Sequence, residues 1–176
     1  MARDIHLTLK YLQTIFFGAN DAATEGTLQH VPLEEYRRNL KRIIAHPLLA
    51  AHSPKMILIV PPPVCEYKMQ EFNREMGRTI LQRVANVTKK YADAAKEVAK
   101  EVGVTTVDLW SVFMAYTGWH EGEPYPGSLS QPRSEKLGEL LRDGWFFHAY
   151  LGFPSAADEY KGSILLQRDM RSCTTR

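Results

Sequence analysis

Cysteine is almost absent from this sequence, and the two that occur are far apart. Cys65 follows a run of prolines, and Cys173 lies in a polar tail three residues before the last. A disulfide framework or a cysteine-rich zinc site needs more cysteines at close spacing, so both are excluded. The cysteine content therefore favours a reducing compartment.

Long apolar runs are also missing. The longest, "MILIVPPPV", is too short to cross a bilayer and contains three prolines. The first thirteen residues, "MARDIHLTLKYLQ", have no apolar segment of signal-peptide length. We therefore expect a cytoplasmic protein that does not bind membranes.

Neither sign of charge dominates. The sequence has 22 basic and 20 acidic residues, which gives a formal net charge of +2. Basic and acidic residues are interleaved, as in "LEEYRRNLKR", which is typical of a solvated helix face. No field strong enough to attract nucleic acid follows from this balance, so we expect no nucleic-acid partner.

What the sequence does contain predicts one α/β domain over residues 1–176, whose 44% hydrophobic content is enough for a core. Apolar runs predict strands at 12–17, 56–60 and 104–110, and helical spacing predicts helices between them. The first helix follows Pro32 and stops before Pro47. A long helical stretch covers about 70–102, with a break near Gly77 or within 86–88. Alternating strands and helices favour a parallel sheet.

Polar or special residues lie at or just beyond the end of each predicted strand. They are Asn20, the prolines 61–63 and Asp108. Ligands of parallel α/β sheets bind beyond the carboxyl ends of the strands, so we expect the functional edge here. The stretch "TIFFGAND" at 14–21 shows the ambiguity. Taken alone, its Gly-Ala-Asn-Asp is more simply explained as a turn than as an active-site loop.

Several segments together resemble one family. They are "FFGANDA", "QHVPLEEYRRNLKRII", "ILIVPPPV", "YADAAKEVAKEVGV", "VDLWSVFM" and "LLRDG". In this order they resemble the SGNH (GDSL-type) hydrolases, and most closely the fungal isoamyl-acetate-hydrolysing esterases. The resemblance covers about 12–144, and the tail 145–176 diverges from the family. It implies a three-layer, flavodoxin-like parallel sheet and hydrolysis of small acyl esters, acetate esters above all.

In this family a serine hydroxyl attacks the ester carbonyl, and a histidine oriented by an aspartate takes its proton. The resemblance assigns Asn20 to the oxyanion hole and Asp143 to the orienting carboxylate. We also predict substrate contacts for Gly18, which lets the backbone turn tightly, and for His30, although an ordinary loop histidine is the simpler interpretation of His30. This chemistry needs no cofactor. Adjacent His120 and Glu121 on a glycine-rich loop do not form a ligand set, so we expect no metal.

Two parts of the family pattern are not found. No Gly-Asp-Ser occurs anywhere in the sequence. By the family pattern we expect an N-terminally truncated fold that lacks the first strands and the nucleophile. The family's Asp-Gly-x-His continues after Asp143 with Phe146, and the nearest histidine is His148. His148 is either a displaced catalytic base or part of diverged sequence, and the poor match of the tail favours the second.

These gaps predict weak or absent activity for this chain alone. The alternatives to an esterase are a decayed remnant and a binding or regulatory module that kept the fold. Without the first strands, the strand 12–17 would be an exposed apolar edge, which natural sheets avoid. We therefore expect self-association through this strand, or a companion chain that supplies the missing strands.

Overall fold

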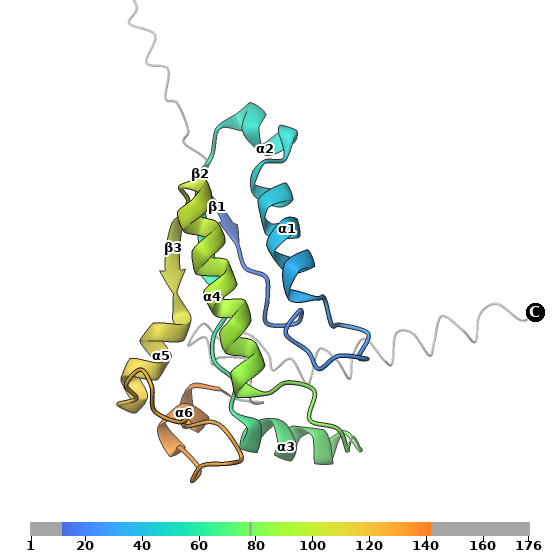
Figure 1. Ribbon diagram of the computed structural model, residues 1–176, viewed down its shortest axis with the longest axis vertical. Coiled ribbons are helices and arrows are strands. Elements are labelled where there is room, and N and C mark those ends of the chain that lie inside the picture. The colour runs from blue at the N-terminus through green and yellow to red at the C-terminus, as the bar shows by residue number, and fades with distance from the viewer. Residues whose placement is uncertain (1–11, 78, 142–176) are drawn as a thin grey trace, which may run out of the picture.

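The computed structural model describes residues 12–77 and 79–141 as a parallel sheet with helices packed around it (Figure 1). The elements are β1 (Leu12–Ile15), α1 (Leu33–Ile44), α2 (Pro47–His52), β2 (Lys55–Val60), α3 (Glu66–Glu75), α4 (Ala85–Val102), β3 (Thr105–Asp108), α5 (Leu109–Thr117) and α6 (Glu135–Leu140).

The three strands lie in the order β1-β2-β3, and both neighbouring pairs are parallel. Ile15 is opposite Leu58, and Val60 is opposite Asp108, so all three carboxyl ends meet at one edge. The predicted α/β architecture with a parallel sheet is confirmed. β1 lies at one side of this sheet, and within the described residues it pairs with β2 alone.

Helix α1 forms where the apolar spacing predicted it. Tyr36, Leu40 and Ile44 recur every fourth residue and are all buried. Acidic residues fill the first turn and basic ones the last, which suits the helix dipole at both ends. The helix ends before Pro47, as predicted, but Pro47 then opens the short helix α2, which was not predicted. Proline suits the first turn of a helix because its missing N–H has no intrahelical partner there.

The long helical stretch breaks between α3 and α4, as predicted near Gly77. Gly77 has a φ of +67°, which favours glycine and ends the helix. Met69 is buried, but Met76 and Ile80, which lie within the predicted helical stretch 70–102, are exposed. Helix was expected at both positions, but α3 stops at Glu75, so these residues leave its buried face.

The outer strands are shorter than predicted. β1 ends at Ile15, before the two phenylalanines of the predicted strand 12–17. β3 ends at Asp108, and Leu109 and Trp110 already belong to α5. The physical reason at β3 is capping: Asp108 Oδ1 accepts from the Ser111 backbone N–H at 3.0 Å, which starts a helix.

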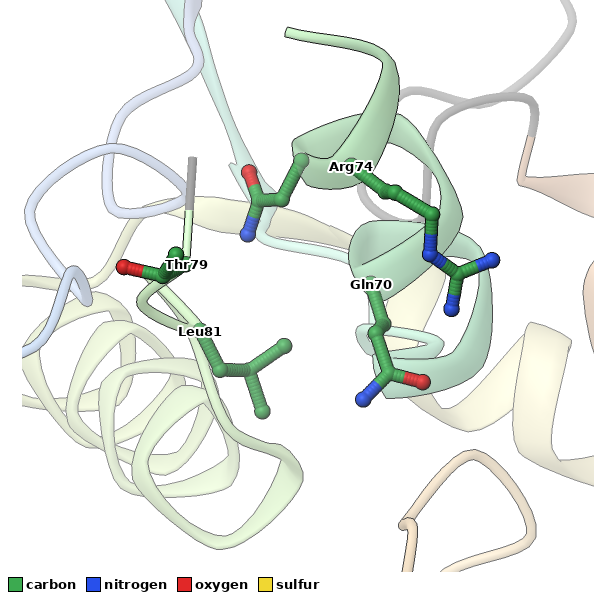
Figure 2. A pocket seen from close by; sticks show the side chains of 5 residues that line it. Gln70, Arg74, Thr79 and Leu81 are labelled. Carbon is green, nitrogen blue, oxygen red and sulfur yellow. The ribbon is translucent and has the colours of Figure 1, made fainter. Parts of the chain in front are cut away.

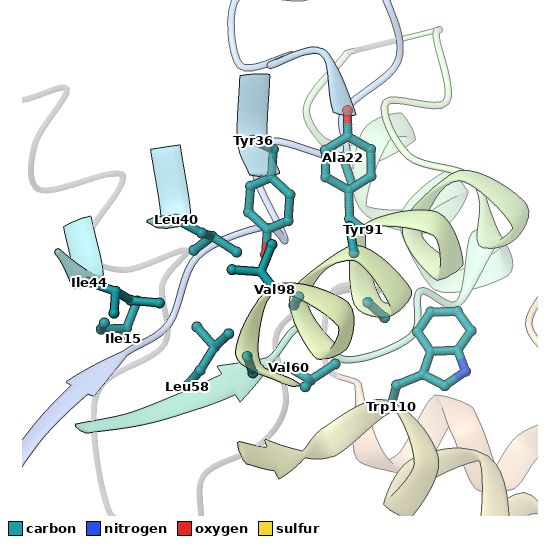
Figure 3. Packing of buried hydrophobic residues seen from close by; sticks show 14 of the residues in the cluster. Ile15, Ala22, Tyr36, Leu40, Ile44, Leu58, Val60, Tyr91, Val98 and Trp110 are labelled. Carbon is teal, nitrogen blue, oxygen red and sulfur yellow. The ribbon is translucent and has the colours of Figure 1, made fainter. Parts of the chain in front are cut away.

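The main core lies between the sheet and the helices α1 and α4 (Figure 3). Leu58 and Val60 of β2 meet Leu40 of α1 and Val98 of α4 there. Alanines of α4 allow close approach of the helix to the strands; they are Ala92, Ala94, Ala95 and Ala99. On the opposite side, Val107 of β3 is 43% exposed. The described helices therefore cover one face of the sheet more completely than the other.

Candidate functional site at the carboxyl edge of the sheet

The opening stretch of the site, Gly18 to Asp21, forms a tight turn directly after β1. The Gly18 N–H donates to Asp21 Oδ2 at 3.0 Å, and the Ala22 N–H donates to the Gly18 carbonyl at 3.0 Å. The Ala23 N–H donates to the Asn20 carbonyl at 3.0 Å. The segment is therefore a turn in conformation and lies at the functional edge in position, so the two interpretations of its sequence are compatible.

Gly18 is held where no side chain fits. Its φ is +114°, and a Cβ there would lie 2.6 Å from Tyr36 Oη and 3.0 Å from Pro61 Cγ. The Tyr36 hydroxyl donates to the Phe17 carbonyl at 3.1 Å. Burial is the main factor that raises the pKa of Tyr36, so this hydroxyl remains a donor across the neutral range. Gly18 thus lets the turn pack against α1 and the buried prolines that follow β2.

Asn20 lies at the exposed surface of this turn, and its carboxamide oxygen accepts a hydrogen bond from the buried side. Arg83 Nη2 donates to Asn20 Oδ1 at 2.9 Å. A guanidinium has no acceptor, so the atom facing it must be the amide oxygen and not the nitrogen. Within the described residues, Asn20 Nδ2 donates no hydrogen bond to the protein. Its two N–H groups are therefore available to a ligand.

Arg83 was not found by sequence reasoning. Its Nε donates to the Ala19 carbonyl at 2.6 Å, and Nη2 also donates to Gln29 Oε1 at 2.7 Å. The side chain is only 1% exposed although it lies on an irregular segment before α4. The one signal in the sequence was a single arginine within "ILQRVANV", where apolar neighbours dominate.

The charge on Arg83 is retained despite its burial. Burial lowers the pKa of Arg83 to about 10, and the nearby Asp21 carboxylate acts in the opposite direction. The guanidinium therefore stays protonated at neutral pH. Its charge is balanced by the carboxylate that also accepts from the Gly18 N–H. The buried Arg83 cation therefore lies directly behind the exposed Asn20 amide of the turn.

His30 stabilises the loop that continues from this turn to α1. Its Nδ1 lies 2.7 Å from the Ala23 carbonyl, and the following Val31 N–H donates to the Asp21 carbonyl at 3.1 Å. The ring is partly buried. This contact explains His30 as a residue that stabilises the loop. A contact between His30 and the substrate stays a prediction.

Asp108 reaches the predicted edge but is committed to the start of α5. In addition to the Ser111 N–H, it accepts from the Ser111 hydroxyl at 2.6 Å. Partial burial raises the pKa of Asp108, but the Ser111 hydrogen bonds and Lys96 outweigh it and lower the pKa overall. This carboxylate is therefore an ionised helix cap.

Glu66 joins three segments at the same end of the sheet. Its Oε1 accepts from the Ala85 N–H at 2.7 Å, and its Oε2 accepts from the Leu129 N–H at 2.8 Å. The Glu66 N–H in turn donates to the Gly127 carbonyl at 2.8 Å. The buried carboxylate therefore ties the first turns of α3 and α4 to the loop that precedes α6.

A depression of about 290 Å³ lies between α3 and the segment that leads into α4 (Figure 2). It is lined by Gln70, Asn73, Arg74, Thr79 and Leu81. Asn73 Nδ2 donates to the Ile80 carbonyl at 2.9 Å, while its buried Oδ1 has no hydrogen-bond partner in the part of the chain that the structure describes. Four of the five lining side chains carry polar groups, and Leu81 supplies an apolar wall.

The two predicted triad residues, Asp143 and His148, lie outside the described residues. Their placement relative to Asn20 is therefore not part of the geometry above, and their roles stay predictions. Among the described side chains, no group of three or more His, Cys, Asp or Glu is arranged to hold a metal ion. None of the described helices has the length and apolar character of a membrane span.

Comparison with known proteins identifies the family. A family model described as GDSL-like lipase/acylhydrolase matches residues 9–150. A GDSL esterase/lipase of Arabidopsis thaliana is 31% identical over 144 residues, covering 75% of this chain and 60% of that protein. An isoamyl acetate-hydrolyzing esterase 1 homolog of Bos taurus is 42% identical over 121 residues, covering 66% and 46%.

The chain spans about half the length of the curated relatives it matches. Among solved structures, a lipase/acylhydrolase from Enterococcus faecalis is similar, with a TM-score of 0.47 and 23% identity. That similarity covers 90% of this chain and 60% of the other. The match of the family model over most of the sequence is decisive: the chain belongs to the GDSL-like lipase/acylhydrolase family.

Proposed function

We propose that this chain carries the oxyanion-hole asparagine of a carboxylic ester hydrolase that acts on small acyl esters. The observation that supports this most directly is Asn20. It follows the first strand at the carboxyl edge, its Oδ1 is engaged by Arg83, and its Nδ2 has no partner among the described residues. A rigidly held donor of this kind stabilises the negative charge that develops on the carbonyl oxygen in acyl transfer.

The neighbouring residues have supporting roles in this proposal. Gly18 allows the turn, and since its N–H already donates to Asp21, its contribution is to position the loop. His30 forms part of the loop beside the substrate. Asp143 would orient an imidazole, for which His148 is the candidate. The name of the bovine relative, an isoamyl acetate-hydrolyzing esterase 1 homolog, supports an acetate ester as the substrate class.

Acyl transfer also needs a nucleophile, and this sequence contains no Gly-Asp-Ser. We therefore propose that this chain by itself hydrolyses esters weakly or not at all. Removing the nucleophile of a triad leaves only the rate that binding and the oxyanion hole supply. The alternative favoured by the same observation is a non-catalytic homologue that binds a ligand or regulates a partner.

Incubation with p-nitrophenyl acetate and a fluorophosphonate probe tests this proposal. We expect a hydrolysis rate equal to that of the buffer and no serine adduct by peptide mass spectrometry. Covalent labelling of any serine would contradict the proposal of inactivity and would identify the nucleophile. In that case Asn20→Asp, which keeps the shape but removes both donors, must lower kcat by about 10²- to 10³-fold for the oxyanion assignment to stand.

We also propose that the chain associates with a second copy through β1. Leu12 and Phe17 are 61% and 53% exposed, and a groove of about 690 Å³ runs from Phe17 along α1 to Pro47. Unpaired strand edges with exposed apolar side chains favour pairing between chains.

Sedimentation at increasing concentration tests this association. Leu12→Lys places a charge at the edge and should shift the chain toward the monomer. Leu28→Lys is the matched control, because Leu28 is fully exposed on the loop between β1 and α1 and is not part of the strand. An equal effect of both variants, or a wild-type chain that is monomeric throughout, would rule out this interface.

A further inference from the structure

The buried arginine beneath the site has a role that neither the sequence pattern nor the family match assigns. We propose that Arg83 is the positioning residue of the Asn20 carboxamide: it fixes the oxygen inward, aims both N–H groups at the ligand, and strengthens them as donors. This inference rests on the proposed function of Asn20 and extends it to the residue that orients the amide.

The first argument is the direction of the hydrogen bonds. An asparagine side chain in a turn can rotate so that either its oxygen or its nitrogen faces the solvent. Arg83 offers only donors, and Nη2 lies 2.9 Å from Asn20 Oδ1. The alternative orientation would set the amide N–H groups against guanidinium N–H groups. The exposed side of Asn20 is therefore its donor side, as an oxyanion requires.

The second argument is the rigidity of the guanidinium. Nε donates to the Ala19 carbonyl at 2.6 Å, and Nη2 is shared between Asn20 and Gln29. These hydrogen bonds fix the plane of the Arg83 guanidinium relative to the backbone of Ala19, the residue before Asn20. Because the side chain is almost completely buried, solvent does not compete for its donors. Lysine could not replace this arrangement, since an ammonium lacks the planar fork.

The third argument concerns charge. A cation on the carbonyl oxygen draws electrons from the amide nitrogen, and this polarises the N–H bonds toward the ligand. The positive charge of Arg83, on the far side of the Asn20 amide from the ligand, also stabilises the negative charge that develops on the substrate oxygen. Asp21 balances the cation in the resting state without occupying the Asn20 donors, because its Oδ2 accepts from the Gly18 N–H.

Nuclear magnetic resonance of the ¹⁵N-labelled chain tests the proposal without requiring activity. The Asn20 Nδ2 proton pair is assigned by its loss in Asn20→Ala. In Arg83→Met, which keeps the stem but removes every donor, we expect this pair to move to the shifts of a free asparagine amide. Exchange between its two protons should accelerate about tenfold as the charged hydrogen bond to the oxygen is lost. Arg83→Lys should give the same change, despite its charge.

Arg38→Met is the matched control, since Arg38 is exposed on α1 and pairs with Glu35. It should leave the Asn20 pair unchanged. An Asn20 pair that is unaffected in folded Arg83→Met would overturn the proposal. Should Arg83→Met fail to fold, the wild-type chain decides: Overhauser contacts between Arg83 guanidinium protons and the Asn20 side chain support the proposal, and their absence overturns it. Failure of the proposed function is separate, because it is decided by ester hydrolysis and serine labelling of the wild-type chain, whereas the amide signals report only the orientation of Asn20.

Discussion

Gly18→Ala is expected to lower the free energy of unfolding by about 3 kcal/mol. A left-handed φ of +114° costs an L-residue about 1–2 kcal/mol, and forcing a methyl group into a packed site costs about 1–3 kcal/mol more. The contact that decides the second part is Tyr36 Oη, 2.6 Å from the added Cβ. Urea denaturation of the purified variant gives the measurement.

Gly26→Ala separates the two contributions to this cost. Gly26 has a comparable φ of +87°, but a Cβ added there meets no atom of the described residues within 4 Å. It should lose only the backbone part, about 1–2 kcal/mol. Adding Tyr36→Phe to Gly18→Ala removes the clashing hydroxyl and should recover part of the loss as a coupling energy. Equal losses for both alanine variants would mean that Gly18 is not packed as described.

Trp110→Ala is expected to be the most destabilising single change in the described core, by about 4 kcal/mol. Trp110 is 1% exposed, and its ring meets Tyr125 edge to face at 6.0 Å between centroids. It lies at the point where β3 passes into α5 and packs in the cluster between the sheet and α4 (Figure 3). Deletion of the indole therefore leaves a large cavity at the base of the functional edge.

Trp110→Phe should cost much less than Trp110→Ala, measured by the same denaturation. It keeps most of the apolar volume and removes the indole N–H, which is buried and has no hydrogen-bond partner among residues 12–77 and 79–141. Val112→Ala, at an exposed position of α5, is the control and should change stability by less than about 1 kcal/mol. If Trp110→Ala cost no more than this control, the residue would not be a core residue in solution.

The strands, the main helices and the edge at which polar residues gather could be predicted from the sequence. Short apolar runs predict strands, and apolar residues at every fourth position predict a helix. Both are local preferences, and the tertiary structure did not override them. Boundaries were less predictable. Leu109 and Trp110 have the composition of a strand, yet Asp108 caps a helix before them. Met76 and Ile80 continue the apolar pattern of α3, yet the helix ends at Glu75.

The residues around Asn20 show the same division. Asn20 and Gly18 could be proposed from a short motif and the family resemblance, because a strand followed by a polar turn is a local signal. Arg83 could not, because it is separated from Asn20 by 63 residues and no local pattern links them. The same is true of Glu66, whose partners Ala85 and Leu129 come from two other segments.

By itself the sequence determined the parallel α/β class, the family, and the position of Asn20 after the first strand, since each depends on neighbouring residues or on ordered motifs. Only the tertiary structure decided which way the Asn20 amide faces. That orientation depends on a buried guanidinium delivered by a distant segment, and burial of a charge is possible only once the fold supplies its acceptors.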